Sequence, residues 1–145
     1  MEKNIINLIR SFALLPEDYR KNVELYLIGP LSSSTKQFKL LVEQLGLQDI
    51  VKFHGGKYGQ EKIEALLDLD VYMHPAYSDV VGISVMEALA LGIPTIATRT
   101  SHMSYFNTTG AFVMVEPTAS DLGRGVREMI DNKNNWQNYS EKAKN

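Results

Sequence analysis

Short apolar runs recur along most of the chain and alternate with stretches of mixed polarity. The runs cover residues 23–28, 50–54, 71–73, 95–98 and 112–115, and they end at glycine, proline or polar residues. Apolar residues at consecutive positions are typical of strands that are buried on both faces. The pattern therefore predicts five short strands.

The stretches between these runs carry apolar residues three and four positions apart, as on one face of a helix. They predict helices over residues 3–15, 35–45, 60–69, 82–91, 120–131 and 136–144. In the third of these, we expect Ile63, Leu66 and Leu67 to be buried. Strands alternate with helices between Val23 and Val115, which implies an α/β fold: a parallel sheet with helices on both faces and right-handed crossovers.

Composition narrows the class of protein. The 145 residues suffice for one domain with its own core, and residues 132–145 are expected to form a helical tail. A net charge of −2 offers no basic surface for nucleic acid, and the lack of cysteine excludes disulfides and thiolate metal sites. No apolar run reaches the ~18–20 residues of a membrane-spanning helix. These features are typical of a globular protein of a reducing compartment.

Residues 70–98 are the most informative stretch, with the pattern strand, loop, helix, turn, strand. Gly92 fits the C-terminal cap of the helix, and Pro94 prevents its continuation. Glu87 is the only charged residue of a helix that is otherwise almost entirely apolar, so we expect the helix to be packed on both sides. Two interpretations of Glu87 stay open. It either complements the helix dipole in the first turn at a solvent edge, or it serves a binding site.

The spacing of two acids favours the binding site. Seven residues separate Asp79 from Glu87, and the loop between them enters the N-terminus of the helix. Such a terminus offers free N–H groups and partial positive charge to a phosphate. Carboxylates on either side can accept hydrogen bonds from sugar hydroxyls, an arrangement that suits a nucleoside diphosphate sugar.

The predicted topology brings further loops to the same place. Ligands of open parallel sheets bind beyond the carboxyl ends of the strands. Gly29, the pair His54 and Gly55, and residues 74–82 and 98–102 all follow predicted strands. We therefore expect these loops to converge on one rim of the sheet.

The segment from Asp79 onward resembles the donor-binding signature of retaining GT-B glycosyltransferases, the family often called glycosyltransferase family 4, group 1. That signature is an acid, seven residues, a glutamate, and then A-x-A-x-G-x-P. The corresponding residues in this chain are Asp79, Glu87, Ala88, Ala90, Gly92 and Pro94. The resemblance runs along nearly the whole chain and implies a Rossmann-like, C-terminal half of a GT-B fold whose first strand is missing.

The resemblance also implies roles for individual residues. Glu87 would hold the ribose hydroxyls, Asp79 would contact the donor sugar, and Lys3 would neutralise the leaving diphosphate without a metal ion. Further contacts to the nucleotide sugar would come from Gly82, Ile83, Ser84, Gly29, His54 and Gly55. Simpler interpretations stay open for three of these residues. Lys3 could be an ordinary lysine at the chain terminus, Gly29 could form a turn at the end of a strand, and His54 could be a strand-end residue without a ligand.

For the whole protein the resemblance implies retaining transfer of a hexose from a UDP- or GDP-sugar to an unidentified glycan or lipid, in carbohydrate biosynthesis. The chain would be a piece of a longer polypeptide that lacks an arginine-bearing strand before Lys3 and an N-terminal acceptor domain. We expect this piece to bind a nucleoside diphosphate weakly and not to catalyse transfer alone. The expected location is the cytoplasm, at the inner membrane surface through the missing domain.

Departures from the signature keep two alternatives open. Asp79 replaces the usual glutamate, Val80 and Val81 replace a glycine and an aromatic residue, and Ser101 and His102 replace a glycine pair. One alternative is a degenerate, non-catalytic module that binds a nucleotide sugar or a partner. The other is an enzyme on a similar sheet, such as a nucleotide-sugar epimerase.

Overall fold

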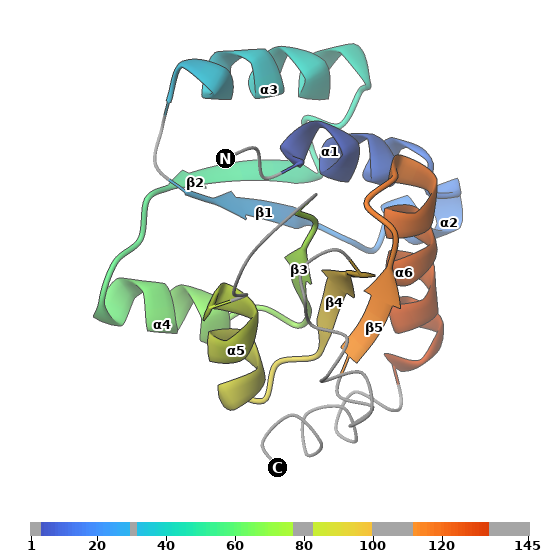
Figure 1. Cartoon of the computed structure of the whole chain (residues 1–145). Helices are drawn as coiled ribbons and strands as arrows, with labels where there is room; N and C mark the ends of the chain where they lie inside the picture. Colours follow the sequence, from blue (N-terminus) through green and yellow to red (C-terminus); the bar gives the residue numbers. More distant parts are fainter. Residues whose placement is uncertain (1–3, 30–31, 77–82, 100–111, 134–145) are drawn as a thin grey trace.

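The computed structural model describes residues 4–29, 32–76, 83–99 and 112–133 (Figure 1). Within these ranges, residues 83, 84 and 112 are described by their backbone alone. Helices and strands alternate along most of the chain. In order they are α1 Ile5–Ala13, α2 Glu17–Arg20, β1 Leu25–Ile28, α3 Ser33–Gln44, β2 Val51–Gly55, α4 Gln60–Leu67, β3 Tyr72–His74, α5 Ile83–Ala90, β4 Thr95–Thr98, β5 Phe112–Val115 and α6 Ala119–Asp131. All five predicted strands are present, so the α/β fold class is confirmed.

The strands pair in parallel, but they form two sheets where the sequence predicts one. β1 pairs with β2, with Leu25 opposite Val51. β4 lies between β3 and β5, with Ile96 opposite Met73 on one side and Val113 on the other. Among the described residues no ladder joins β1 to β3, although both border the same cavity. The predicted parallel pairing with helices on both faces is confirmed, and in the part of the chain that the structure describes the strands are divided between two sheets.

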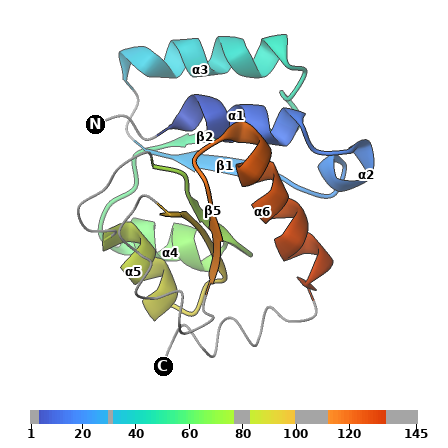
Figure 2. The ribbon, with the colours of Figure 1, turned by 45° about the vertical axis from the view of Figure 1, so that its right-hand side comes forward.

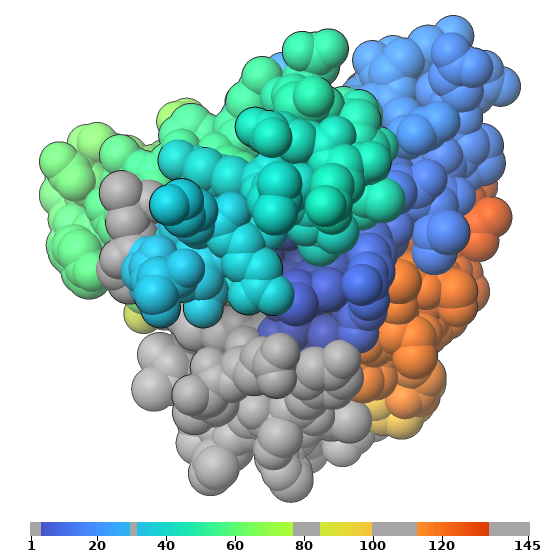
Figure 3. All heavy atoms as spheres, turned by 90° about the horizontal axis from the view of Figure 1, so that it is seen from above, coloured from blue at the N-terminus to red at the C-terminus, as the bar shows by residue number. Residues whose placement is uncertain are grey.

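Helices cover both faces of the strands, as predicted. α1 packs against α6 (Figure 2). Together with α3 these helices contribute to one large core that also takes side chains from β1, β2, β4 and β5. On the outer surface, α1 lies between α3 and α6 (Figure 3). On the other face α5 packs on β4 and β5, and α4 packs beside α5. Alternation along β4 explains this division, because Ile96 enters the first core and Ala97 the second.

Local sequence sets several helix ends. Ser32 and Thr35 form a reciprocal capping box at the start of α3. Gly92, with φ of 75°, ends α5, where the N–H groups of Gly92 and Ile93 donate to the carbonyls of Leu89 and Ala88. This is the glycine-terminated cap predicted from the sequence.

Other local predictions are wrong. Ile63 and Leu67 of α4 are exposed and only Leu66 is buried, because a single face of this short helix meets a neighbour. α5 is not packed on both sides, since Met86 and Ala90 are exposed. The single-turn helix α2 is not predicted by the pattern. The predicted helix over 136–144 lies outside the described residues. Among the residues that are described, no helix is long and apolar enough to cross a membrane.

Candidate functional site

Residues at the ends of three different strands border one cavity of about 1680 Å³. Gly29 follows β1, Gly55 ends β2 and Pro75 follows β3, and all three line this cavity. The three strand ends thus border one cavity, which residues near the amino ends of β1 and β3, such as Glu24 and Asp70, also line, so convergence on a single rim stays a prediction. α5 adds Glu87 to the same lining, although Glu87 lies far from the other residues in sequence.

Glu87 lies on the accessible side of α5 and not in packed hydrocarbon. Its side chain is 41% exposed, and its Oε2 is 2.7 Å from Nζ of Lys62 on α4, which is 40% exposed. α5 begins at Ile83, and its first turn contains no acid. The interpretation of Glu87 as a first-turn residue that complements the helix dipole is therefore wrong. The carboxylate is accessible, pairs with Lys62 and lies beside the cavity.

Two glycines leave space at the rim. The N–H of Gly29 donates to the carbonyl of Gly55 over 2.9 Å, which ties the ends of β1 and β2 together. A Cβ added to either glycine would meet no other atom within 4 Å, and Gly55 has a φ of 71°. Packing within the protein therefore does not require glycine at position 29. The open space is compatible with a ligand that approaches the backbone.

His54 does not line this cavity, although its ring contacts Tyr26, which does. It is exposed, and its ring lies edge-on to that of Tyr26, with centroids 4.7 Å apart. Its assignment to ligand binding stays a prediction with no geometric support.

The remaining predicted residues are only partly described. Ile83 and Ser84 begin α5, with backbone positions alone. Asp79, Gly82 and Lys3 lie outside the described residues. Asn4, which follows Lys3, places the start of α1 at the carboxyl ends of two strands, because its Nδ2 donates to the carbonyls of Pro75 and Pro117, each over 2.8 Å.

Two residues at the cavity are not predicted from the sequence. Lys62 pairs with Glu87 across two helices, and only the tertiary structure reveals that pairing. Tyr58 is 70% exposed, lines the cavity and lies over Gly56, since a Cβ there would be 3.0 Å from the tyrosine hydroxyl oxygen. An aromatic residue after the glycine pair is the sequence signal that could have identified Tyr58.

The chain is similar to known proteins in sequence and in fold. Residues 1–145 match the model of the family described as glycosyl transferases group 1. The chain is similar to the lipopolysaccharide glucosyltransferase WaaG of Escherichia coli (strain K12), with 31% identity over 104 residues, which cover 72% of this chain and 27% of that protein.

Solved structures share the fold. A crystal structure of WaaG has a TM-score of 0.86 and 26% identity, covering 98% of this chain and 38% of that one. A crystal structure of Anabaena Alr3699/HepE in complex with UDP has a TM-score of 0.82 and 19% identity, covering 95% of this chain and 38% of that one. The chain therefore spans between 27% and 38% of the length of these proteins.

Proposed function

The chain belongs to the glycosyl transferases group 1 family and has the GT-B type of α/β fold, and we propose that it binds the nucleotide-sugar donor of a retaining glycosyltransferase. The observation that carries this proposal is the position of Glu87. It is the glutamate of the sequence signature, it is accessible, and it lies on one cavity with Gly29 and Gly55.

In this proposal, Glu87 accepts hydrogen bonds from the ribose hydroxyls of a UDP- or GDP-sugar. Lys62 already contacts one carboxylate oxygen, so the carboxylate must be shared between Lys62 and the ribose when the donor binds. The N-terminus of α5 and Lys3 stabilise the diphosphate, and Asp79 contacts the hexose. Retention of anomeric configuration and independence from metal ions complete the proposal.

The acceptor site belongs, in this proposal, to the remainder of a longer protein. The support is that the chain spans 27% of its E. coli relative. We therefore expect the 145-residue chain to bind the donor without transferring the sugar. Formation of a glycoside by this chain alone would contradict that expectation.

Titration with UDP and GDP, followed by calorimetry, tests the role of Glu87. We expect Glu87→Gln to weaken binding of the preferred nucleotide by about tenfold or more, because hydrogen bonds to a charged group contribute roughly 1.5–3 kcal/mol. Glu61→Gln removes an exposed acid of α4 and should leave affinity unchanged. Lys62→Met breaks the same ion pair but keeps the carboxylate, so it should weaken binding less than Glu87→Gln.

Equal affinities for the wild-type chain and Glu87→Gln would reject this role. The degenerate binding module, favoured by the altered residues Val80, Val81 and His102, would then be the better description. Appearance of an epimerised sugar from UDP-glucose would favour the epimerase instead. The two readouts, affinity and product, separate the three functions.

A further inference from the structure

The ion pair between Lys62 and Glu87 is positioned by the packing of two helices. Leu66 of α4 and Ala88 of α5 are buried in the same small core. Lys62 lies one turn before Leu66, on the same side of α4, and Glu87 directly precedes Ala88. The contact between the two helices therefore brings Nζ of Lys62 to 2.7 Å from Oε2 of Glu87.

The helices do not need this pair for their own stability. Lys62 lies in the first turn of α4, where a lysine opposes the helix dipole and an acid such as the neighbouring Glu61 complements it. Both Lys62 and Glu87 are partly exposed, and an ion pair at such a position contributes little to folding. The pair is therefore better explained by a ligand than by the fold.

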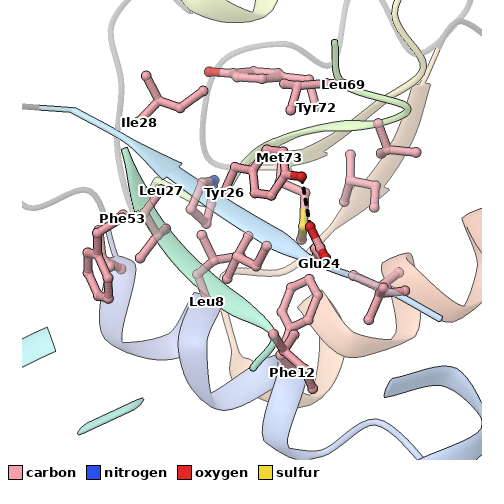
Figure 4. Close-up of a pocket in the computed structure, with 18 of the residues that line it drawn as sticks. Leu8, Phe12, Glu24, Tyr26, Leu27, Ile28, Phe53, Leu69, Tyr72 and Met73 are labelled. Carbon is pink, nitrogen blue, oxygen red and sulfur yellow. Dashed lines mark hydrogen bonds between the residues drawn. The ribbon is translucent and has the colours of Figure 1, made fainter. Parts of the chain in front are cut away.

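The surroundings of the pair point to a polar ligand. Among the ion pairs that join described residues, this is the one with both members on the cavity. Leu8, Phe12 and Leu69 are among the apolar side chains of the cavity wall, which offer no hydrogen bond to a sugar hydroxyl (Figure 4). Lys62 and Glu87 together offer both a donor and an acceptor.

A hydroxyl group is complementary to this combination. A carboxylate accepts hydrogen bonds, an ammonium donates them, and a hydroxyl does both. The ammonium of Lys62 has three N–H donors, and its contact with Oε2 of Glu87 uses one of them. A single hydroxyl can therefore donate to Glu87 while its oxygen accepts from Lys62.

We propose that Lys62 determines specificity for the ribose of the nucleotide, because it recognises the vicinal hydroxyls jointly with Glu87. This inference rests on the proposed function, in which Glu87 binds the ribose. Both hydroxyls donate to the carboxylate, and Lys62 donates to the oxygen of one of them while it keeps its contact with Oε2. The ion pair is thus retained when the nucleotide binds, and it acts as one recognition unit.

The exposure of the pair sets the size of the effect. A buried site strongly rejects an analogue that lacks a hydroxyl, because the polar groups of the site are left unpaired. Lys62 and Glu87 are accessible, so water replaces part of the lost hydrogen bonding. We therefore expect removal of one ribose hydroxyl to weaken binding to the wild-type chain by about fivefold to thirtyfold.

Calorimetric titration with UDP or GDP, whichever binds more tightly, and with its 2′-deoxy and 3′-deoxy analogues tests the proposal. Lys62→Met should weaken binding of the parent nucleotide by about threefold to tenfold. It should reduce the penalty of one deoxy analogue by the same factor and leave the other penalty unchanged, because Lys62 contacts one hydroxyl. Lys62→Arg retains N–H donors and should keep both penalties within about threefold of the wild-type values.

The matched control is Lys36→Met, which removes an exposed lysine near the start of α3 that is not among the described residues of the cavity lining. It should change none of the affinities, and thermal unfolding of every variant verifies the fold. Equal weakening of all three nucleotides by Lys62→Met would overturn the proposal and assign the lysine to the diphosphate.

Two further outcomes separate this proposal from the proposed function. If Lys62→Met changes no affinity while Glu87→Gln weakens binding, the role of Lys62 is overturned and that of Glu87 stands. If the wild-type chain and Glu87→Gln bind the parent nucleotide equally, the proposed function is rejected, and the role of Lys62 is rejected with it.

Discussion

At the scale of single residues, tertiary packing explains why Gly125 is a glycine although glycine is unfavourable inside a helix. Glycine weakens a helix interior, yet Gly125 lies in the middle of α6. A Cβ there would be 2.8 Å from Cγ1 of Val115 and 3.0 Å from Cγ2 of Ile96. Both neighbours are fully buried, so neither can move aside. The close approach of α6 to β4 and β5 therefore requires glycine.

We expect Gly125→Ala to lower the free energy of unfolding by about 1–3 kcal/mol, because overpacking outweighs the gain in helix propensity of roughly 1 kcal/mol. Urea denaturation measures the change. Arg127→Ala, at an exposed position of α6, is the matched control and should change stability by less than about 0.5 kcal/mol. A stabilised Gly125→Ala variant would show that the contact with Val115 and Ile96 relaxes at no cost.

At the scale of one element, the start of α6 is held by hydrogen bonds that meet at Asp121. The N–H of Asp121 donates to Oγ1 of Thr118 over 3.2 Å, and the N–H of Glu116 donates to Oδ2 of Asp121 over 2.6 Å. Arg124 donates to the other carboxylate oxygen from Nε over 2.6 Å. The Arg124 hydrogen bond, with that from the Glu116 N–H, lowers the pKa of Asp121. The ionised carboxylate thus stabilises the helix start.

The lowered pKa of Asp121 determines how the stability of the protein changes with pH. A carboxyl whose pKa is lower in the folded state stabilises the protein above its unfolded value, near 3.8, and that contribution is lost as pH falls through the folded value. We expect Asp121→Asn to destabilise the chain by about 1–2 kcal/mol at pH 7 and less at low pH. Urea titrations across this range measure it. Asp18→Asn, at a 93% exposed side chain, should have little effect at any pH.

At the scale of the whole molecule, Asn4 joins distant parts of the chain. Its amide contacts the carbonyl of Pro75, 71 residues away, and that of Pro117, 113 residues away. It is 2% exposed, and its φ of 59° is a left-handed conformation that asparagine and glycine tolerate. One side chain therefore positions α1 against the ends of β3 and β5.

Two substitutions separate the conformation of Asn4 from its hydrogen bonds. Asn4→Gly keeps the backbone conformation but loses both donors, so we expect a loss of about 1–3 kcal/mol in unfolding free energy. Asn4→Ala adds the cost of a positive φ, roughly 1–2 kcal/mol. Thermal and urea unfolding of both variants give the comparison. Full stability of Asn4→Gly would mean that the bonds to Pro75 and Pro117 contribute nothing.

Much of the candidate site can be predicted from the sequence. The contacts that cannot be predicted depend on how neighbouring helices are oriented. The signature singles out Glu87, and the strand ends single out Gly29 and Gly55, which line one cavity as expected. The ion pair of Glu87 with Lys62 is not predicted, because it depends on how α4 and α5 are rotated about their axes. The exposure of Ile63 and Leu67 has the same origin.

By itself the sequence determines where strands and helices form and several of the points where they end. Consecutive apolar residues, the Ser32 cap and Gly92 act over a few positions, so their effect does not depend on the rest of the fold. Only the tertiary structure decides which strand edges form hydrogen-bonded ladders with each other. β1 and β3 carry the apolar sequences of interior strands, yet their facing edges border a cavity, because a hydrogen-bonded ladder needs a partner that lies beside it in space.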